Sequence, residues 1–149
     1  GSGEKVTLKL VAKYGDACNI GGIDPAVYRH KFDVLRAHCD DVGRDYNTII
    51  KSAEIFTYLT LPGVTPEQAT AHARRGAADL LGREVSLEEF RANSFVGYPQ
   101  GIIGSPQEII DIYSRVIDAG VEYIIVYLND VVHLETLQAF AVEVLPAFK

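Results

Sequence analysis

The sequence predicts an α/β fold with a parallel sheet, and two observations carry this prediction. Three segments begin with a capping residue followed by proline, which is the pattern of a helix start. The three starts are Asp24-Pro25, Thr65-Pro66 and Ser105-Pro106. Short apolar runs rich in β-branched and aromatic residues alternate with these helical segments, and residues 121–128 are the clearest run. Helices that alternate with buried strands are typical of parallel sheets.

The first part of the chain predicts a helix, a strand and a second helix. Apolar positions in residues 6–14 fit a strand and a helix alike, and Gly15 as a cap favours the helix. Residues 16–20 predict a short strand between glycines. From Asp24 an apolar stripe steps by four and three residues, and Gly43 follows as the helix stop.

The second part predicts two further strands separated by helices. Residues 49–61 predict a strand, and we interpret residues 65–98 as a helical insertion between this strand and its own helix. A loop over 97–104 precedes the helix that starts at Ser105. Residues 121–128 contain one charge, which predicts a strand buried on both faces, and a helix over 133–145 closes the chain.

Composition excludes several classes of protein. The chain of 149 residues has the length of one domain, 1–149, with 48% apolar and 23% charged residues. A net charge of -6 and scattered Lys and Arg argue against a nucleic-acid partner. No apolar run approaches the roughly 20 residues of a membrane span. Cys18 and Cys39 form no metal or redox motif, so we expect a cytoplasmic protein.

No local motif assigns a reaction. The four histidines have no partner four residues away, and the sequence contains no nucleotide-binding fingerprint, catalytic triad signature or metal motif. We therefore assign no catalytic residue and no metal ligand from local patterns.

Five segments, in chain order, resemble the carboxy-terminal part of luciferase-like oxidoreductases, which depend on a flavin or on the deazaflavin coenzyme F420. The motif Gly104-Ser105-Pro106-Gln107-Glu108 resembles the family's seventh helix, and Asp118-Ala119-Gly120-Val121-Glu122-Tyr123 the eighth strand and its entry. The five segments are 1–14, 16–19, 35–45, 104–123 and 135–146.

The resemblance implies a partial (β/α)8 TIM barrel. It would comprise about the last three β/α units, with parallel strands and the helical insertion placed before the penultimate barrel helix. Three strands cannot close a barrel, and a complete one takes about 250 residues. We therefore expect roughly half of the parent enzyme to be missing.

The family performs two-electron chemistry with FMN or F420 as its cofactor. The parent is thus expected to be a monooxygenase or a hydride-transferring oxidoreductase that acts on a small organic substrate. In this family the residues nearest the reacting ring come largely from the amino-terminal strands, so we expect the isolated chain to be inactive.

The resemblance places cofactor contacts in the glycine-rich loop Gly1, Ser2 and Gly3. Glycines allow close backbone approach, and free N–H groups at a helix start favour the cofactor's phosphate. A flexible terminus is the alternative. Asn19, at the carboxyl end of the predicted strand 16–20, is expected either to line the cofactor pocket or to cap a turn.

A second hypothesis is a non-catalytic α/β half-barrel that serves as an interaction or oligomerisation module. Under either hypothesis an open parallel sheet has unpaired strand edges and an uncovered apolar face. We therefore expect the chain to associate with itself as a homo-oligomer or with the missing amino-terminal half-barrel.

Overall fold

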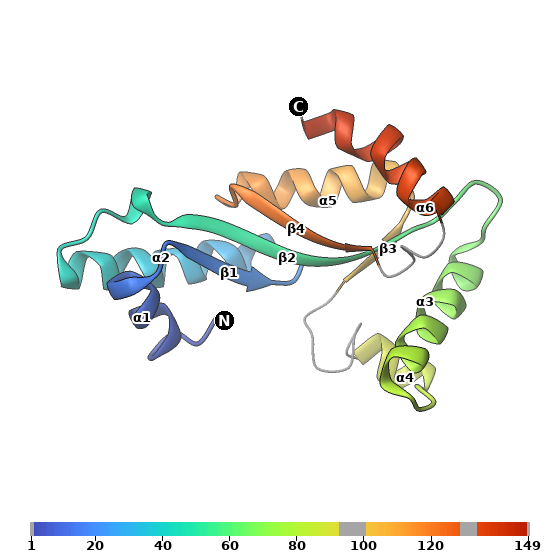
Figure 1. The fold of residues 1–149 in the computed structure, drawn as a ribbon, viewed down its shortest axis with the longest axis horizontal. Coiled ribbons are helices and arrows are strands. Elements are labelled where there is room, and N and C mark those ends of the chain that lie inside the picture. Colours follow the sequence, from blue (N-terminus) through green and yellow to red (C-terminus); the bar gives the residue numbers. More distant parts are fainter. Residues whose placement is uncertain (1, 93–100, 129–133, 149) are drawn as a thin grey trace.

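The computed structural model describes residues 2–92, 101–128 and 134–148, which form one four-stranded parallel sheet with helices packed on it (Figure 1). The predicted α/β class is confirmed. The elements are α1 (Thr7–Tyr14), β1 (Ala17–Gly21), α2 (Pro25–Val42), η1 (Tyr46–Thr48), β2 (Ile50–Leu59), α3 (Pro66–Leu81), α4 (Leu87–Ala92), β3 (Ile102–Gly104), α5 (Pro106–Asp118), β4 (Tyr123–Leu128), α6 (Leu134–Ala139), η2 (Phe140–Val144) and η3 (Leu145–Phe148).

The three predicted helix starts are confirmed in their capping contacts. The Asp24 side chain accepts a hydrogen bond from the Ala26 N–H, 2.8 Å away. Thr65 and Ser105 each form a complete capping box, with Gln68 and Glu108 as the respective partners. These local contacts fix where α2, α3 and α5 begin.

Strand β2 lies at the centre of the sheet. It pairs with β1 over Ile50–Glu54 and with β4 over Ser52–Thr57, and all pairs are parallel. Thr57 pairs with both Ile102 of β3 and Leu128 of β4, so these two strands lie on opposite edges of β2. Strand β3 therefore follows β1 along the same edge.

The predicted count of three strands is wrong, because part of the predicted loop 97–104 is strand β3. Three residues carry too little pattern to predict a strand, and β3 is defined by its pairing with β2. At Gly101 a Cβ atom would lie 2.7 Å from the carbonyl oxygen of Phe56, so the chain enters β3 against the backbone of β2. Only glycine permits that approach.

The outer face of the sheet, which we define by Ala53, Ile55 and Leu59 of β2, is covered by helices. These side chains belong to one core that also includes residues of α1, α2, α5 and the closing helical segments. Its fully buried members include Leu8, Tyr28, Leu35, Ile109, Val116 and Val144. This core holds the sheet and its helices together.

The opposite, inner face of the sheet is open along β4. Tyr123, Ile125 and Tyr127 are 61%, 37% and 47% exposed, whereas the residues between them pack towards the core. The prediction that this strand is buried on both faces is wrong for the described residues. The apolar composition of β4 would allow burial on both faces, but among the described residues only its outer face is covered.

Helices α3 and α4 stand beyond the carboxyl end of β2 (Figure 1). A smaller core joins them to the inner face through Phe56 and Tyr58. Both helices lie within the predicted insertion 65–98, whose last residues, 93–98, fall outside the described residues. That this segment is an insertion into a barrel stays a prediction.

The closing helix differs from its prediction. Helix α6 is described from Leu134 and continues through the π-helical η2 into the 3₁₀ turn η3, which runs past Pro146. Thr136, Phe140 and Val144 are its buried side chains. Proline is tolerated here because it lies near the start of a new turn.

The expectations about the cysteines and about membrane spans can be compared with the described residues. Cys18 and Cys39 are free, buried thiols, and burial raises the pKa of both. Among the helices described, none is both long enough and apolar enough to cross a membrane.

Candidate functional site

Polar side chains gather on the inner face where β1 and β2 pair. Side chains alternate along a strand, so Asn19 of β1 and Ser52 and Glu54 of β2 share the face opposite Cys18 and Ala53. The Asn19 amide nitrogen donates to a Glu54 carboxylate oxygen at 2.8 Å. The Ser52 hydroxyl lies 3.1 Å from the Asn19 oxygen and 3.2 Å from the Cys18 carbonyl. We call Asn19, Ser52 and Glu54 the inner polar cluster.

Glu54 lies level with the end of β1. Its partners in register are Gly21, which has no side chain, and Ile125 of β4. No described residue forms an ion pair with Glu54, although its side chain is half-buried. Its carboxylate oxygens can therefore accept hydrogen bonds from a ligand's N–H or O–H groups.

An aromatic pair borders the inner polar cluster. Phe56 follows Glu54 on the same face and stacks on Tyr127, with ring centroids 4.8 Å apart. Phe56 is buried, whereas Tyr127 is exposed. The inner face thus combines a hydrogen-bonding cluster with an aromatic surface, a combination that is typical of sites for planar organic ligands.

The turn after β1 is held by Tyr28 of α2. Its hydroxyl donates to the carbonyl oxygens of Gly22 and Ile20, at 2.6 and 3.2 Å. Burial, with a smaller contribution from the nearby Glu54 charge, raises the pKa of Tyr28 far above its usual value. The neutral hydroxyl therefore fixes the backbone at the end of β1.

Asn19 lies in the middle of β1 rather than at its carboxyl end as predicted. Two hydrogen bonds of its side chain run across to Ser52 and Glu54 of β2. The expectation that Asn19 faces a cofactor pocket stays a prediction. Glu54 and Ser52 were not predicted from the sequence. The available signal for Glu54 was its charge inside the largely apolar strand predicted over 49–61.

The predicted glycine loop is only partly described, since Gly1 falls outside the described residues. Ser2 and Gly3 are exposed, and the Gly3 carbonyl accepts a hydrogen bond from the Leu8 N–H at 2.9 Å. A Cβ atom at Gly3 would lie 3.0 Å from the Thr7 hydroxyl oxygen, so glycine also has a local packing reason here. The role of Ser2 and Gly3 in cofactor binding stays a prediction.

The following residue, Glu4, anchors this segment to α2. Its carboxylate accepts a hydrogen bond from the Lys31 ammonium at 2.6 Å and lies 3.0 Å from His30 Nε2. These bonds, Lys31 first, lower the pKa of Glu4. His38 Nε2 donates to the Glu4 carbonyl at 2.8 Å. The chain after the glycines is therefore fixed by three side chains.

A cavity of about 450 Å³ lies at the carboxyl end of β2. Strand residues, the loop after β2, α3 and α6 all contribute to its wall. Gln68, His72 and Glu135 supply polar groups beside an otherwise largely apolar wall. Ligand sites of parallel α/β proteins form at this end of the strands, and the volume falls in the range of small-molecule pockets. This cavity was not predicted from the sequence, because only the folded chain brings α3 and α6 around one hollow.

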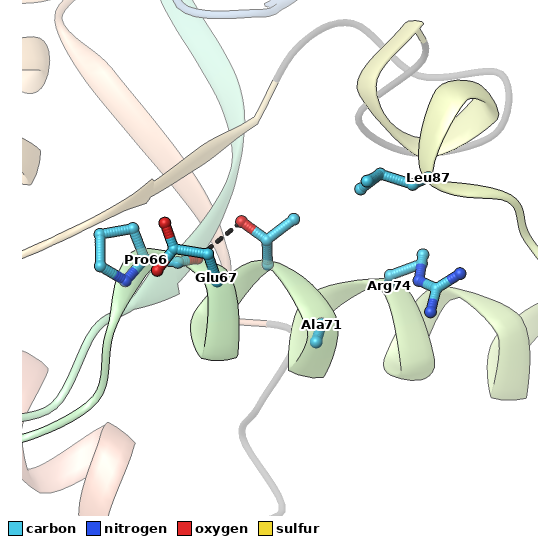
Figure 2. Close-up of a pocket in the computed structure, with 6 residues that line it drawn as sticks. Pro66, Glu67, Ala71, Arg74 and Leu87 are labelled. Atoms are coloured by element: carbon cyan, nitrogen blue, oxygen red, sulfur yellow. Dashed lines mark hydrogen bonds between the residues drawn. The ribbon is translucent and has the colours of Figure 1, made fainter.

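A second hollow, of about 500 Å³, lies between α3 and α4 (Figure 2). It is away from the inner polar cluster, and none of the cluster residues lines it. Its lining residues are Pro66, Glu67, Thr70, Ala71, Arg74 and Leu87.

The described residues contain no group of three or more His, Cys, Asp or Glu side chains placed to hold a metal ion. His30 and His38 contact the amino-terminal segment and His72 lines the cavity at the end of β2. His133 falls outside the described residues.

Comparison with known proteins identifies the fold. No model of a known protein family matches the chain, and no curated protein matches its sequence. Solved structures of flavin- and F420-linked enzymes do share its fold. At the identities found, 14–17%, the likeness shows the fold alone.

Three similar structures illustrate the match. The chain matches an F420-dependent secondary alcohol dehydrogenase, solved with an F420–acetone adduct, at a TM-score of 0.68 and 17% identity, over 100% of this chain and 47% of that one. It matches a riboflavin lyase, solved with modified FMN and riboflavin, at a TM-score of 0.68 and 15% identity, over 98% of this chain and 41% of that one. It matches the F420-dependent tetrahydromethanopterin reductase of Methanopyrus kandleri at a TM-score of 0.64 and 14% identity, over 100% of this chain and 50% of that one. The chain therefore spans half or less of each of these enzymes.

Proposed function

We propose that this chain is the carboxy-terminal part of a flavin- or F420-dependent luciferase-like oxidoreductase. The parent enzyme would carry out hydride transfer or monooxygenation on a small organic substrate in the cytoplasm. One observation carries the proposal: a parallel sheet whose outer face is packed against helices presents an open inner face with a polar cluster and an aromatic pair. The enzymes that share this fold are about twice as long.

In this proposal the inner face is part of a barrel interior. The amino-terminal half-barrel would complete the ring of strands and cover Tyr123, Ile125 and Tyr127. The chain supplies only part of the pocket wall, so we expect it to be inactive alone.

Two groups of residues fit different parts of a cofactor. Glu54 would repel a phosphate, so we assign Asn19 and its cluster to the uncharged ring of the cofactor or to the substrate. Gly1, Ser2 and Gly3 would approach the phosphate through their backbone. When bound, FMN or F420 would supply the two-electron exchange. The chain's own residues would bind and orient it.

The second candidate function is a non-catalytic module that associates through the open inner face. The exposed tyrosines and isoleucine of β4 favour it, because uncovered apolar side chains of this size mark interaction surfaces. The two candidates differ in what precedes Gly1 in the gene.

Cofactor binding by a longer protein tests the proposal. The chain is expressed alone and together with the in-frame coding sequence that precedes Gly1, and each is titrated with FMN and with F420 by fluorescence. We expect the longer protein to bind one cofactor at least about 100-fold more tightly than the chain alone, because the isolated site lacks most of its wall. Equal affinity, or an upstream sequence without a half-barrel, contradicts the proposal and favours the non-catalytic module.

A further inference from the structure

The hollow between α3 and α4 is lined by one stripe of α3. Glu67, Thr70, Ala71 and Arg74 are spaced by three, one and three residues, which places them on one face of the helix. Leu87 of α4 forms the opposite wall, as Figure 2 shows. The hollow of about 500 Å³ is not filled by any described residue.

The two ends of this stripe carry opposite charges that have no ion-pair partner among the described residues. Glu67 lies in the first turn of α3, and Arg74 lies two turns later, roughly 10 Å along the axis. Arg74 donates one hydrogen bond, to the Val85 carbonyl at 3.2 Å, and its guanidinium has further donors.

Arg83, in the turn between α3 and α4, forms an ion pair within the chain, whereas the Glu67 carboxylate accepts, among the described residues, only local hydrogen bonds from its own N–H and from Thr65. Arg83 binds both carboxylate oxygens of Glu89, at 2.6 and 3.1 Å. That pair closes within the chain, whereas Glu67 and Arg74 are too far apart along α3 to close on each other.

The centre of the stripe is small and uncharged. Ala71 has only a methyl group, and the Thr70 hydroxyl is already bonded to the Pro66 carbonyl at 2.8 Å. A second helix can therefore approach α3 closely here.

The stripe is complementary to itself when reversed. If a second copy of α3 packs antiparallel, Glu67 of each copy lies opposite Arg74 of the other. The twofold axis then passes between Thr70 and Ala71, midway between the charges. Such a contact uses the same surface twice and closes at two copies.

We propose that the groove between α3 and α4 is a homodimer interface, in which the α3 helices of two copies pack antiparallel with two reciprocal Glu67–Arg74 ion pairs. A second copy is the favoured occupant because both charges lie on one stripe at mirror positions. The proposal concerns a surface away from the inner face and does not depend on the proposed function.

Charge reversal tests this interface directly. The variants Glu67→Arg and Arg74→Glu are studied by sedimentation velocity, alone and as an equimolar mixture. Each variant places like charges opposite each other twice per dimer, so we expect each to weaken dimerisation by about tenfold or more. In the mixture, one stripe carries two positive and the other two negative charges, so a heterodimer forms with at least the wild-type affinity.

The control is Arg75→Glu, which makes the same charge change on α3 outside the groove and should change dimerisation by less than about threefold. Circular dichroism verifies that the variants fold, and heterodimer formation by the mixture is itself evidence of folding. Three results overturn the proposal: a wild-type monomer at about 100 µM, association that both reversals leave unchanged, or a mixture that does not associate. The second result would assign association to the open sheet instead.

Discussion

The outer and inner faces of the sheet are made by the same strands but differ in what covers them. On the outer face, Ala53 and Ile55 are completely buried against the helices. On the inner face, Ile125 and the tyrosines on either side of it are partly exposed. Successive side chains of a strand point to opposite faces, and both faces of this sheet contain apolar residues. The comparison teaches that composition indicates the capacity to be buried, while the partner decides whether burial occurs.

This difference also separates stability from binding. A buried side chain stabilises the fold in proportion to the apolar area removed from water. The outer face therefore carries most of the sheet's contribution to stability. The inner face, with its polar cluster, contributes less and is the surface that a ligand or a second polypeptide can contact.

Two isoleucines give the largest test of the comparison. We expect Ile55→Ala to lower the free energy of unfolding by about 2–5 kcal/mol, because it leaves a cavity in the core. We expect Ile125→Ala to cost less than about 1 kcal/mol, because its side chain is already in contact with water. Urea unfolding at low protein concentration measures both.

Equal losses of unfolding free energy for the two variants would contradict the difference between the faces. They would mean that the inner face is covered in solution. Repeating the measurement over a range of protein concentrations would then show whether a second copy covers it, since association makes stability depend on concentration.

Tyr113 on α5 makes the contribution of the outer face to stability depend on pH. Its hydroxyl lies 2.7 Å from the Thr57 hydroxyl beneath the outer face. Burial raises the pKa of Tyr113 to about 12, against a small lowering by Thr57. The stabilisation is complete below the unfolded-state pKa of 10.0 and is lost as pH rises through the folded-state value.

We therefore expect wild-type stability to fall between about pH 10 and pH 12, with Tyr113 contributing roughly 2–3 kcal/mol to the fall. Tyr113→Phe should cost about 1–2 kcal/mol at neutral pH and reduce the alkaline slope. Tyr127→Phe removes a hydroxyl from the exposed inner face and should change neutral stability by less than about 0.5 kcal/mol. An unchanged alkaline slope in Tyr113→Phe would contradict the assignment.

Local signals predicted most of the fold. The caps at Asp24, Thr65 and Ser105 require only neighbouring residues, and the structure confirms each helix start. Strand β3 and the exposed side of β4 were not predicted, because both depend on contacts between distant segments. The π-helical continuation after Ala139 also has no local sequence signal.

The candidate site was less predictable for the same reason. Asn19 was selected, but its register against Ser52 and its bond to Glu54 follow from strand pairing rather than from sequence spacing. The cavity at the end of β2 is lined by residues of both α3 and α6, which only the folded chain brings around one hollow. A charge inside an apolar strand was the one signal that could have drawn attention to Glu54.

The smallest test compares two glutamates, Glu122 and Glu54. Lys51 is only 6% exposed at its side chain and binds Glu122 at 2.7 Å, with the Glu122 side chain 52% exposed. Burial raises the pKa of Glu122, but the side-chain and backbone hydrogen bonds from Lys51 outweigh it, so the pKa is lowered. Glu54 has Asn19 as a hydrogen-bond donor and no ion pair with a described residue.

We expect Glu122→Gln to cost about 0.5–1 kcal/mol at neutral pH, a modest figure because solvent screens the exposed carboxylate. This contribution is present above the unfolded-state pKa of 4.5 and is lost as pH falls through the lower folded-state value. Glu54→Gln should change stability by less than about 0.5 kcal/mol, since an amide oxygen accepts from Asn19 as a carboxylate does. Urea unfolding at pH 7 and pH 3 measures both variants. A larger loss for Glu54→Gln would reverse the ranking, because only a cation from outside the described residues, or from a second copy, could make that carboxylate the more important of the two.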